Sequence, residues 1–114
     1  MSDDLFERIV RREIPADIVF EDDDVLAFRD VNPQAPTHLL IIPKRRIATI
    51  NDAEDSDAEL LGRLILTARR IASEQGIAED GYRLVFNCNE HGGQSVYHIH
   101  LHLLGGRAMA WPPG

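Results

Sequence analysis

Three histidines alternate with apolar residues in the segment His98-Ile99-His100-Leu101-His102. Because successive side chains of a β-strand point to opposite faces, a strand over residues 96–104 places all three imidazoles on one face. Neighbouring rings on that face start roughly 6.6 Å apart, so they can act together on one ligand group. Crowding disfavours several positive charges and pushes at least one ring towards its neutral form near neutral pH. A neutral imidazole is a nucleophile, and the segment therefore predicts nucleophilic catalysis.

Metal binding is the main alternative chemistry for these side chains. The alternating histidines together with His38 offer three or four nitrogen ligands, which is the number that zinc uses. However, Asp30 is the only candidate carboxylate nearby in the pattern, and no cysteine–histidine spacing typical of a structural zinc site is present. We therefore expect no metal site and no required cofactor, with zinc as the alternative. Ordinary surface histidines are a third interpretation, which the apolar opposite face disfavours.

Size and charge limit the classes of partner. A chain of 114 residues can bury one adequate core, so we predict a single domain over residues 1–114. Twelve Lys and Arg residues oppose nineteen Asp and Glu residues, which gives a net charge of −7. A long polyanion is repelled by such a molecule, so we expect no nucleic-acid partner. A few local donors can still hold a mononucleotide.

Cysteine content and hydropathy bear on the compartment. Cys88 is the single cysteine, so no intrachain disulfide can form and nothing indicates an oxidising compartment. The acidic N-terminal segment lacks the basic start and apolar run of a secretory signal. No apolar run approaches the roughly 18 residues of a membrane-spanning helix. We expect a cytoplasmic protein with no membrane partner.

Two helices are predicted from apolar residues at helical spacing. The first covers residues 5–10, and Pro15 stops its pattern. The second begins near Ser56 and Glu59, which have capping-box spacing, and ends at Gly76. Its apolar stripe consists of Leu60, Leu61, Leu64, Ile65, Ala68, Ile71 and Ala72.

Runs of β-branched and aromatic residues between turn-forming residues predict five strands. They cover residues 18–21, 25–29, 37–42, 82–87 and 96–104. The acidic segment 21–24 is typical of a hairpin connection, and residues 89–94 are predicted to be a polar connection with glycines. The order of elements predicts an α+β fold, in which a mainly antiparallel sheet of about five strands carries its helices on one face.

Three segments resemble the histidine-triad (HIT) family. Residues 92–107 (GGQSVYHIHLHLLGGR) resemble its phosphoramidase branch strongly, and residues 28–38 (FRDVNPQAPTH) and 111–114 (WPPG) extend the similarity over nearly the whole chain. The resemblance implies the HIT-like fold and a hydrolase that acts on purine nucleotides.

The resemblance also implies roles for individual catalytic residues. His100 would attack phosphorus and form a nucleotidyl-histidine intermediate that water then cleaves. His102 and the backbone from Gly93 to Ser95 would donate to the phosphate oxygens. Ser95 would also lie near the leaving group, and His98 and His38 would orient the central imidazole.

The implied substrate-binding residues include Asp30 as the acceptor for the ribose hydroxyls and Asn87 near the phosphate. Without the family resemblance, Asp30 would be interpreted as an ordinary turn residue, and the apolar residues of the set given below would be interpreted as ordinary core residues. The full set is Asp30, Val31, Asn87, Gly93, Gln94, Ser95, His100, His102, Leu5, Phe6, Ile9, Phe28, Leu40 and Trp111. The apolar residues Leu5, Phe6, Ile9, Phe28 and Leu40 match positions that wall the purine.

Three functional interpretations remain from this comparison of motifs. The first is a phosphoramidase that binds a purine nucleoside monophosphate or phosphoramidate and needs no metal. The alternatives are a dinucleoside polyphosphate hydrolase and a non-catalytic nucleotide-binding or interaction protein. We further expect a homodimer, from the family and from the long apolar stripe, in which Trp111 reaches the partner's site. The basic run Lys44-Arg45-Arg46 is interpreted as a solvated turn outside the site.

Overall fold

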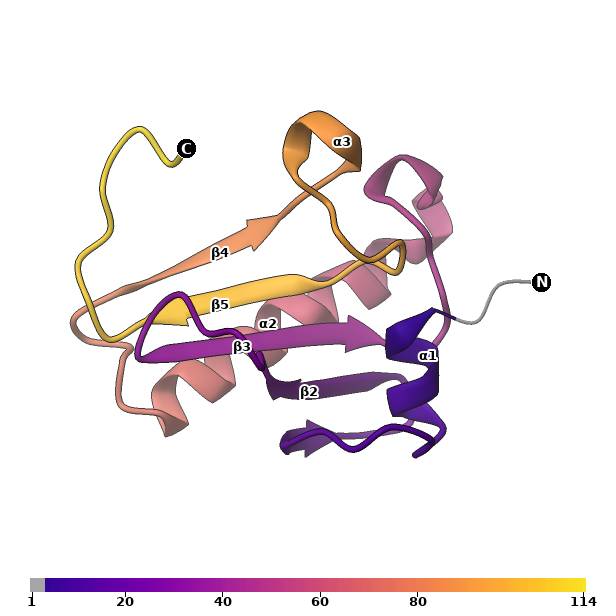
Figure 1. Cartoon of the computed structure of the whole chain (residues 1–114), viewed down its shortest axis with the longest axis horizontal. Helices are drawn as coiled ribbons and strands as arrows, with labels where there is room; N and C mark the ends of the chain where they lie inside the picture. Colours follow the sequence, from indigo (N-terminus) through magenta and orange to yellow (C-terminus); the bar gives the residue numbers. More distant parts are fainter. Residues whose placement is uncertain (1–3) are drawn as a thin grey trace.

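The computed structural model describes residues 4–114 and contains one five-stranded sheet in the order β1-β2-β3-β5-β4 (Figure 1). Every neighbouring pair of strands is antiparallel. The strands are β1 (Ile18–Glu21), β2 (Val25–Arg29), β3 (Thr37–Pro43), β4 (Tyr82–Phe86) and β5 (Leu101–Gly105). The α+β prediction and the antiparallel sheet are confirmed.

The hairpin between β1 and β2 forms where the acidic segment was predicted to turn. The Asp22 carboxylate accepts hydrogen bonds from the backbone N–H groups of Asp24 and Val25, each at 2.8 Å. This is the local bonding that makes aspartate favourable in turns. Arg63 then pairs with Asp22 and with Asp24, which ties the hairpin to the long helix.

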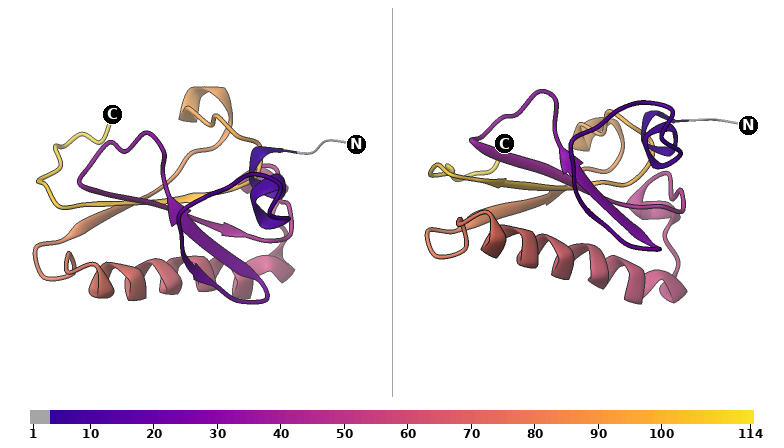
Figure 2. Two further views of the ribbon diagram at one scale, coloured as in Figure 1. Left: turned by 60° about the horizontal axis from the view of Figure 1, so that its bottom comes forward. Right: turned by 90° about the horizontal axis from the view of Figure 1, so that it is seen from below.

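The long helix α2 (Ala58–Glu74) covers one face of the sheet (Figure 2). Most of its apolar stripe packs into a core with the inward residues of β3 and β5, among them Leu39, Ile41, Leu101 and Leu103. The predicted Ser56 cap is wrong. A 3-10 turn, η2 (Asp55–Asp57), precedes the helix, and its Asp57 carboxylate accepts from the Glu54 backbone N–H at 2.9 Å.

The short helix α1 (Leu5–Val10) lies on the opposite face of the sheet from α2 (Figure 2). The prediction that both helices share one face is therefore wrong. Phe6 and Ile9 pack in a second core with Leu26, Phe28, Leu40 and Ile42. Both faces of β3 are buried because its residues alternate between the two cores.

The histidine segment enters the sheet later than predicted. The pairings with β3 and β4 both end at Leu101, so residues 96–100 are not a strand. The Ile99 N–H instead donates to the Ile47 carbonyl at 2.8 Å, away from both ladders. The alternation of sides nevertheless persists, since Ile99 joins the core beneath α2 while His100 lines a cavity on the other side.

Besides η2, two short helical turns were missed by the sequence patterns. Residues 89–92 form a one-turn helix, α3 (Asn89–Gly92), which ends where Gly93 adopts a left-handed conformation (φ 81°). A second turn, η1 (Ile50–Asp52), lies between β3 and α2. Within residues 4–114, no helix combines the length and the apolar character needed to cross a bilayer.

Candidate active site

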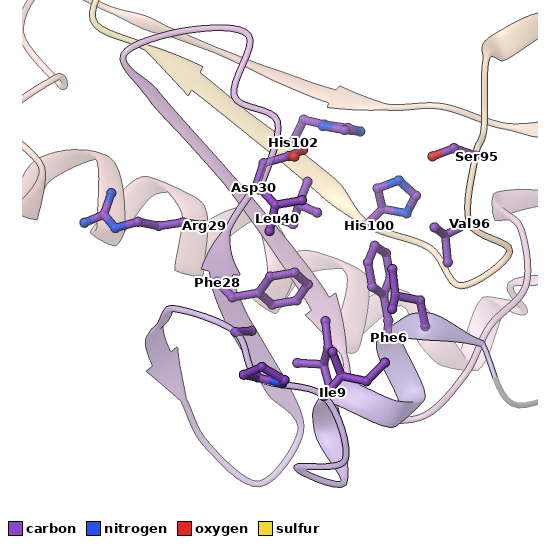
Figure 3. Close-up of a pocket in the computed structure, with 15 residues that line it drawn as sticks. Phe6, Ile9, Phe28, Arg29, Asp30, Leu40, Ser95, Val96, His100 and His102 are labelled. Atoms are coloured by element: carbon purple, nitrogen blue, oxygen red, sulfur yellow. The ribbon is translucent and has the colours of Figure 1, made fainter.

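A cavity of about 370 Å³ opens between α1, the end of β2 and the histidine segment (Figure 3). Its volume falls within the range of small-molecule sites. Ten residues predicted for the site line it together: Leu5, Phe6, Ile9, Phe28, Asp30, Val31, Leu40, Ser95, His100 and His102.

The cavity has apolar walls and one polar end. Phe6 of α1 meets Phe28 of β2 edge to face, with ring centroids 5.5 Å apart. The edge of Phe6 also contacts the ring of His100 at 5.0 Å between centroids. Asp30, Ser95, His100 and His102 gather at the polar end (Figure 3). The cavity could therefore hold a ligand that has a planar apolar group at one end and a charged polar group at the other.

Hydrogen bonds fix which nitrogen of His102 carries its proton. The backbone N–H of Gln34 donates to His38 Nδ1 at 3.0 Å, so the neutral His38 ring carries its proton on Nε2. That Nε2 lies 2.9 Å from His102 Nδ1 and donates to it. The neutral His102 ring must then carry its proton on Nε2. This buried atom has no hydrogen-bond partner among residues 4–114.

The ring of His100 is oriented by the backbone beside it. His100 Nδ1 donates to the carbonyl of His98 at 2.8 Å, so in the neutral ring the lone pair is on Nε2. Burial lowers the pKa of His100 below the usual 6.5, although the hydrogen bond to the His98 carbonyl acts in the opposite direction. A neutral ring with a free nitrogen can act as a nucleophile.

Burial also favours the neutral forms of His102 and His38. Burial, with the nearby His100 and His38 rings, lowers the pKa of His102 to about 4. Burial lowers the pKa of His38 as well, and this outweighs the opposing effect of Asp30. The ring centroids of His100 and His102 lie 5.0 Å apart, so a ring with a lone pair and a ring with an N–H donor are neighbours.

His98 does not line the cavity. Its ring is fully buried, with Nδ1 3.1 Å from Asp4 Oδ2 and Nε2 2.7 Å from the Pro43 carbonyl. Arg46 Nε donates to the same Asp4 oxygen at 2.9 Å. Sequence reasoning missed Asp4 and placed Arg46 in a solvated turn. The 94 positions between Asp4 and His98 leave no local pattern that would reveal their contact.

The residues best placed to hold a metal differ from those proposed for zinc. Ligand atoms of Asp30, His38 and His102 all lie within 4.8 Å of one another. His98 and His100 do not join this group. Both ring nitrogens of His98 face Asp4 and the Pro43 carbonyl, and Nδ1 of His100 faces the His98 carbonyl. The set offers three ligands, and a hydrogen bond already joins its two imidazoles.

Four of the predicted substrate-binding residues lie outside the cavity lining, as do the predicted catalytic residues His38 and His98. Gln94 turns its side chain inwards, where it accepts from the Asn89 N–H at 2.9 Å and donates to the Ala48 and Val96 carbonyls. It therefore shapes the loop that carries Ser95. Asn87 and Gly93 flank α3. Trp111 is 82% exposed and does not reach the cavity of its own chain.

Asp30 keeps its turn role while facing the cavity. Its Oδ1 accepts from the Asn32 N–H at 2.9 Å, and its Oδ2 lies 3.4 Å from His38 Nε2. Both interpretations of this residue therefore fit its position. Lining residues that the sequence patterns missed are Ile14, Pro15, Ala16, Arg29 and Val96. Of these, Pro15 had been assigned only as a helix stop.

Comparisons with known proteins agree with this geometry. A family model described as the HIT domain matches residues 11–109. The chain is 61% identical over 105 residues to a purine nucleoside phosphoramidase of Escherichia coli (strain K12), covering 92% of this chain and 88% of that protein. A HIT family hydrolase structure from Legionella pneumophila has a TM-score of 0.97 and 63% identity, covering 98% of this chain and 100% of that one. One from Clostridium thermocellum has a TM-score of 0.93 and 44% identity, with 96% of each chain covered.

Proposed function

The chain belongs to the HIT domain family, and from this premise we propose that it is a purine nucleoside phosphoramidase. Such an enzyme cleaves the bond between a nucleoside 5'-monophosphate and an amine. One observation carries the proposal beyond the family. At the polar end of a nucleotide-sized cavity, the His100 ring, whose Nε2 carries the lone pair, neighbours the His102 ring, whose Nε2–H has no partner among residues 4–114.

The reaction follows from the protons on these two rings. The lone pair of His100 Nε2 attacks phosphorus, the phosphorus–nitrogen bond breaks, and the leaving amine takes up a proton. Water then attacks the nucleotidyl-histidine, which releases the monophosphate and frees His100. The His102 N–H donates to a phosphate oxygen in both steps, where negative charge grows in the transition state. Burial strengthens this interaction because the local dielectric is low.

The rest of the cavity would bind the nucleoside. We place the purine between the apolar walls of Leu5, Phe6, Ile9, Phe28 and Leu40, and the ribose hydroxyls on the Asp30 carboxylate. Val31 lines the same side. The backbone from Gly93 to Ser95, together with Asn87, would complete the phosphate site. The Ser95 hydroxyl would face the leaving group.

We extend the proposal to the setting of the enzyme. No cofactor is required in it, because His100 supplies the nucleophile and His102 the charge stabilisation. The net charge of −7 argues against a nucleic-acid partner, and the free Cys88 is in keeping with a cytoplasmic location. We infer one HIT domain over residues 1–114.

A panel of substrates tests the proposed reaction. The purified protein is incubated with adenosine and guanosine phosphoramidates and with dinucleoside polyphosphates, each with and without a chelator. We expect faster hydrolysis of the phosphoramidates and no effect of the chelator. Faster cleavage of the polyphosphates would favour the related hydrolase. Nucleotide binding without turnover of any compound would support the non-catalytic alternative.

The pH dependence of kcat/KM should report the neutral state of His100. Protonation removes the lone pair of its Nε2, so activity is present above the pKa and lost as the pH falls through it. Because burial lowers this pKa, we expect kcat/KM to stay level down through about pH 6.5, the value of an ordinary histidine. Steady-state assays across this range check the prediction. An acid limb centred at or above that value would contradict it.

We propose that two copies of the chain form a dimer through the edge of the sheet. The apolar stripe of α2 does not support a dimer, since most of it is buried in the core of its own chain. Instead, β4 is an edge strand that pairs with β5 alone among the described residues 4–114, and its residues Tyr82–Phe86 are all half-buried. An unpaired strand edge with apolar residues is a ready site for a second copy.

Deleting Ala110 to Gly114 should change substrate preference more than stability. Trp111 is exposed, and the carbonyl of the preceding residue, Ala110, accepts a hydrogen bond from Arg83 Nη2 at 2.8 Å. In the proposed dimer this tail reaches the partner's leaving-group side. We expect kcat/KM to shift severalfold between small and bulky leaving groups, while the melting temperature and the dimer seen by sedimentation remain unchanged. Equal kinetics for all leaving groups would count against this arrangement.

A further inference from the structure

We propose that Asp4 is a positioning residue for the nucleophile, and that it acts through His98. The proposal rests on the proposed function, because it assigns Asp4 to the reaction of His100. Asp4 lies 96 positions before His100 in the chain and does not line the cavity. Its effect on the reaction must therefore pass through the groups it contacts.

The Asp4 carboxylate joins three parts of the fold. It caps α1, because Oδ1 accepts from the Glu7 N–H at 2.7 Å, while the Glu7 carboxylate accepts from the Asp4 N–H. It accepts from Arg46 Nε at 2.9 Å. It also faces His98 Nδ1, with its two oxygens at 3.1 and 3.3 Å. The carboxylate is itself nearly buried, at 9% exposure, so these contacts are largely shielded from water.

The contact with His98 leads directly to the nucleophile. The His98 ring is held at both nitrogens, by Asp4 and by the Pro43 carbonyl at the end of β3. The carbonyl of the same residue accepts the His100 Nδ1 proton, which sets the tautomer and the orientation of His100. Residues 96–100 lie outside the sheet ladder, so this carbonyl is held by the bond from the Ile99 N–H of the same peptide to Ile47 and by the side-chain contacts of His98.

Arg46 holds the same stretch of backbone from a second side. Its Nε donates to the carbonyl of Tyr97 at 3.0 Å as well as to Asp4. The peptide between Tyr97 and His98 is therefore fixed by Arg46, while the His98 ring is fixed by Asp4. Phe6 adds a further link, because it follows the capped start of α1 and contacts the rings of both His98 and His100.

The two roles of Asp4 can be separated by substitution. Asp4→Thr keeps an oxygen that can cap α1 but is too short to satisfy His98 and Arg46 together. Asp4→Asn keeps the shape and a cap, but its amide N–H groups oppose one of these donors. Glu7→Ala is the matched control, since it removes the reciprocal half of the capping box and leaves the contacts of His98 in place.

Steady-state kinetics on an adenosine phosphoramidate should separate the variants. We expect both Asp4 variants to lose about 10- to 100-fold in kcat with KM changed less than about twofold, which is the scale of a slightly misplaced reacting group. Glu7→Ala should retain kcat. Nitrogen-15 NMR of the histidine rings should show shifted His98 and His100 signals in the Asp4 variants only. Unchanged kcat and unchanged His100 signals in both variants would overturn the proposal.

The ring signals keep the two proposals distinguishable. If the native protein hydrolyses no phosphoramidate, the proposed function fails, while the His100 signals still show whether Asp4 orients that ring. If both Asp4 variants fail to fold, Arg46→Gln replaces them, because it removes the second partner of the carboxylate and preserves the cap. We then expect a smaller loss of kcat with the same displacement of the His100 signals, and native signals with native kcat would refute the role of Asp4.

Discussion

His100→Ala abolishes turnover in our expectation and leaves nucleotide binding largely intact. The substitution removes the proposed attacking nitrogen, whereas the residues proposed to bind the ribose, the phosphate and the purine are others. Loss of a covalent nucleophile commonly lowers kcat by about 10⁴-fold or more. Loss of one among several ligand hydrogen bonds costs only about 1 to 3 kcal/mol. Single-turnover assays with a phosphoramidate and calorimetry with a nucleoside monophosphate measure the two effects separately.

The native enzyme allows a direct test for the covalent intermediate on His100. Rapid quenching during turnover should trap a nucleotide on His100, seen as added mass on the peptide that spans β5. The exposed His91 of α3 offers a matched control, and His91→Ala should keep native kinetics. Near-native turnover by His100→Ala would refute the nucleophile, and loss of activity on chelation with recovery in zinc would indicate metal catalysis instead.

His102→Ala should lower kcat by about 10²- to 10³-fold, which is the usual effect of removing one donor to an oxyanion. The reason is a pair of hydrogen bonds: the Gln34 N–H donates to His38, and His38 donates to His102. His102 is left with an N–H that has no partner among residues 4–114. Because the pKa of His102 is about 4, its ring donates as a neutral group throughout the physiological range.

His38→Gln gives an internal comparison for this prediction. It disturbs the bond that fixes the His102 tautomer but leaves the His102 donor in place. We expect a smaller loss of kcat than for His102→Ala, with KM similar in both, measured in the same steady-state assay. Equal losses would mean that orientation, and not the donor itself, dominates the role of His102.

The sequence predicts the sheet and most of the cavity because these depend on local periodicity. The alternation of His98, Ile99 and His100 assigns the correct sides even though this stretch is not a strand. Its bounds were misjudged because the Ile99–Ile47 bond that diverts the backbone joins residues far apart in the sequence. The contact of Asp4 with His98 escaped prediction for the same reason. A helix-capping residue can be predicted from its neighbours in the sequence, whereas the contact of the same carboxylate with His98 depends on tertiary structure.

Phe6 shows a related limit of local reasoning. Its spacing predicts a core residue, and it does pack in the core beneath α1. Its ring also contacts His100, and only the placement of α1 on the face away from α2 makes this possible. The tautomers of the histidines could likewise not be predicted from the sequence, since they depend on which donor or acceptor each ring nitrogen contacts in the folded chain.

The alternation of β3 between two cores bears on how this protein can be re-engineered. Leu39 and Ile41 face α2, whereas Leu40 lies on the other side, lines the cavity and pairs with His102 in the ladder. Libraries restricted to Leu40, with its neighbours on the strand held constant, would vary the proposed wall of the base site against a fixed scaffold. Substitutions selected for a new nucleobase would therefore change one face of β3, while substitutions that raise thermal stability would be made on its other face.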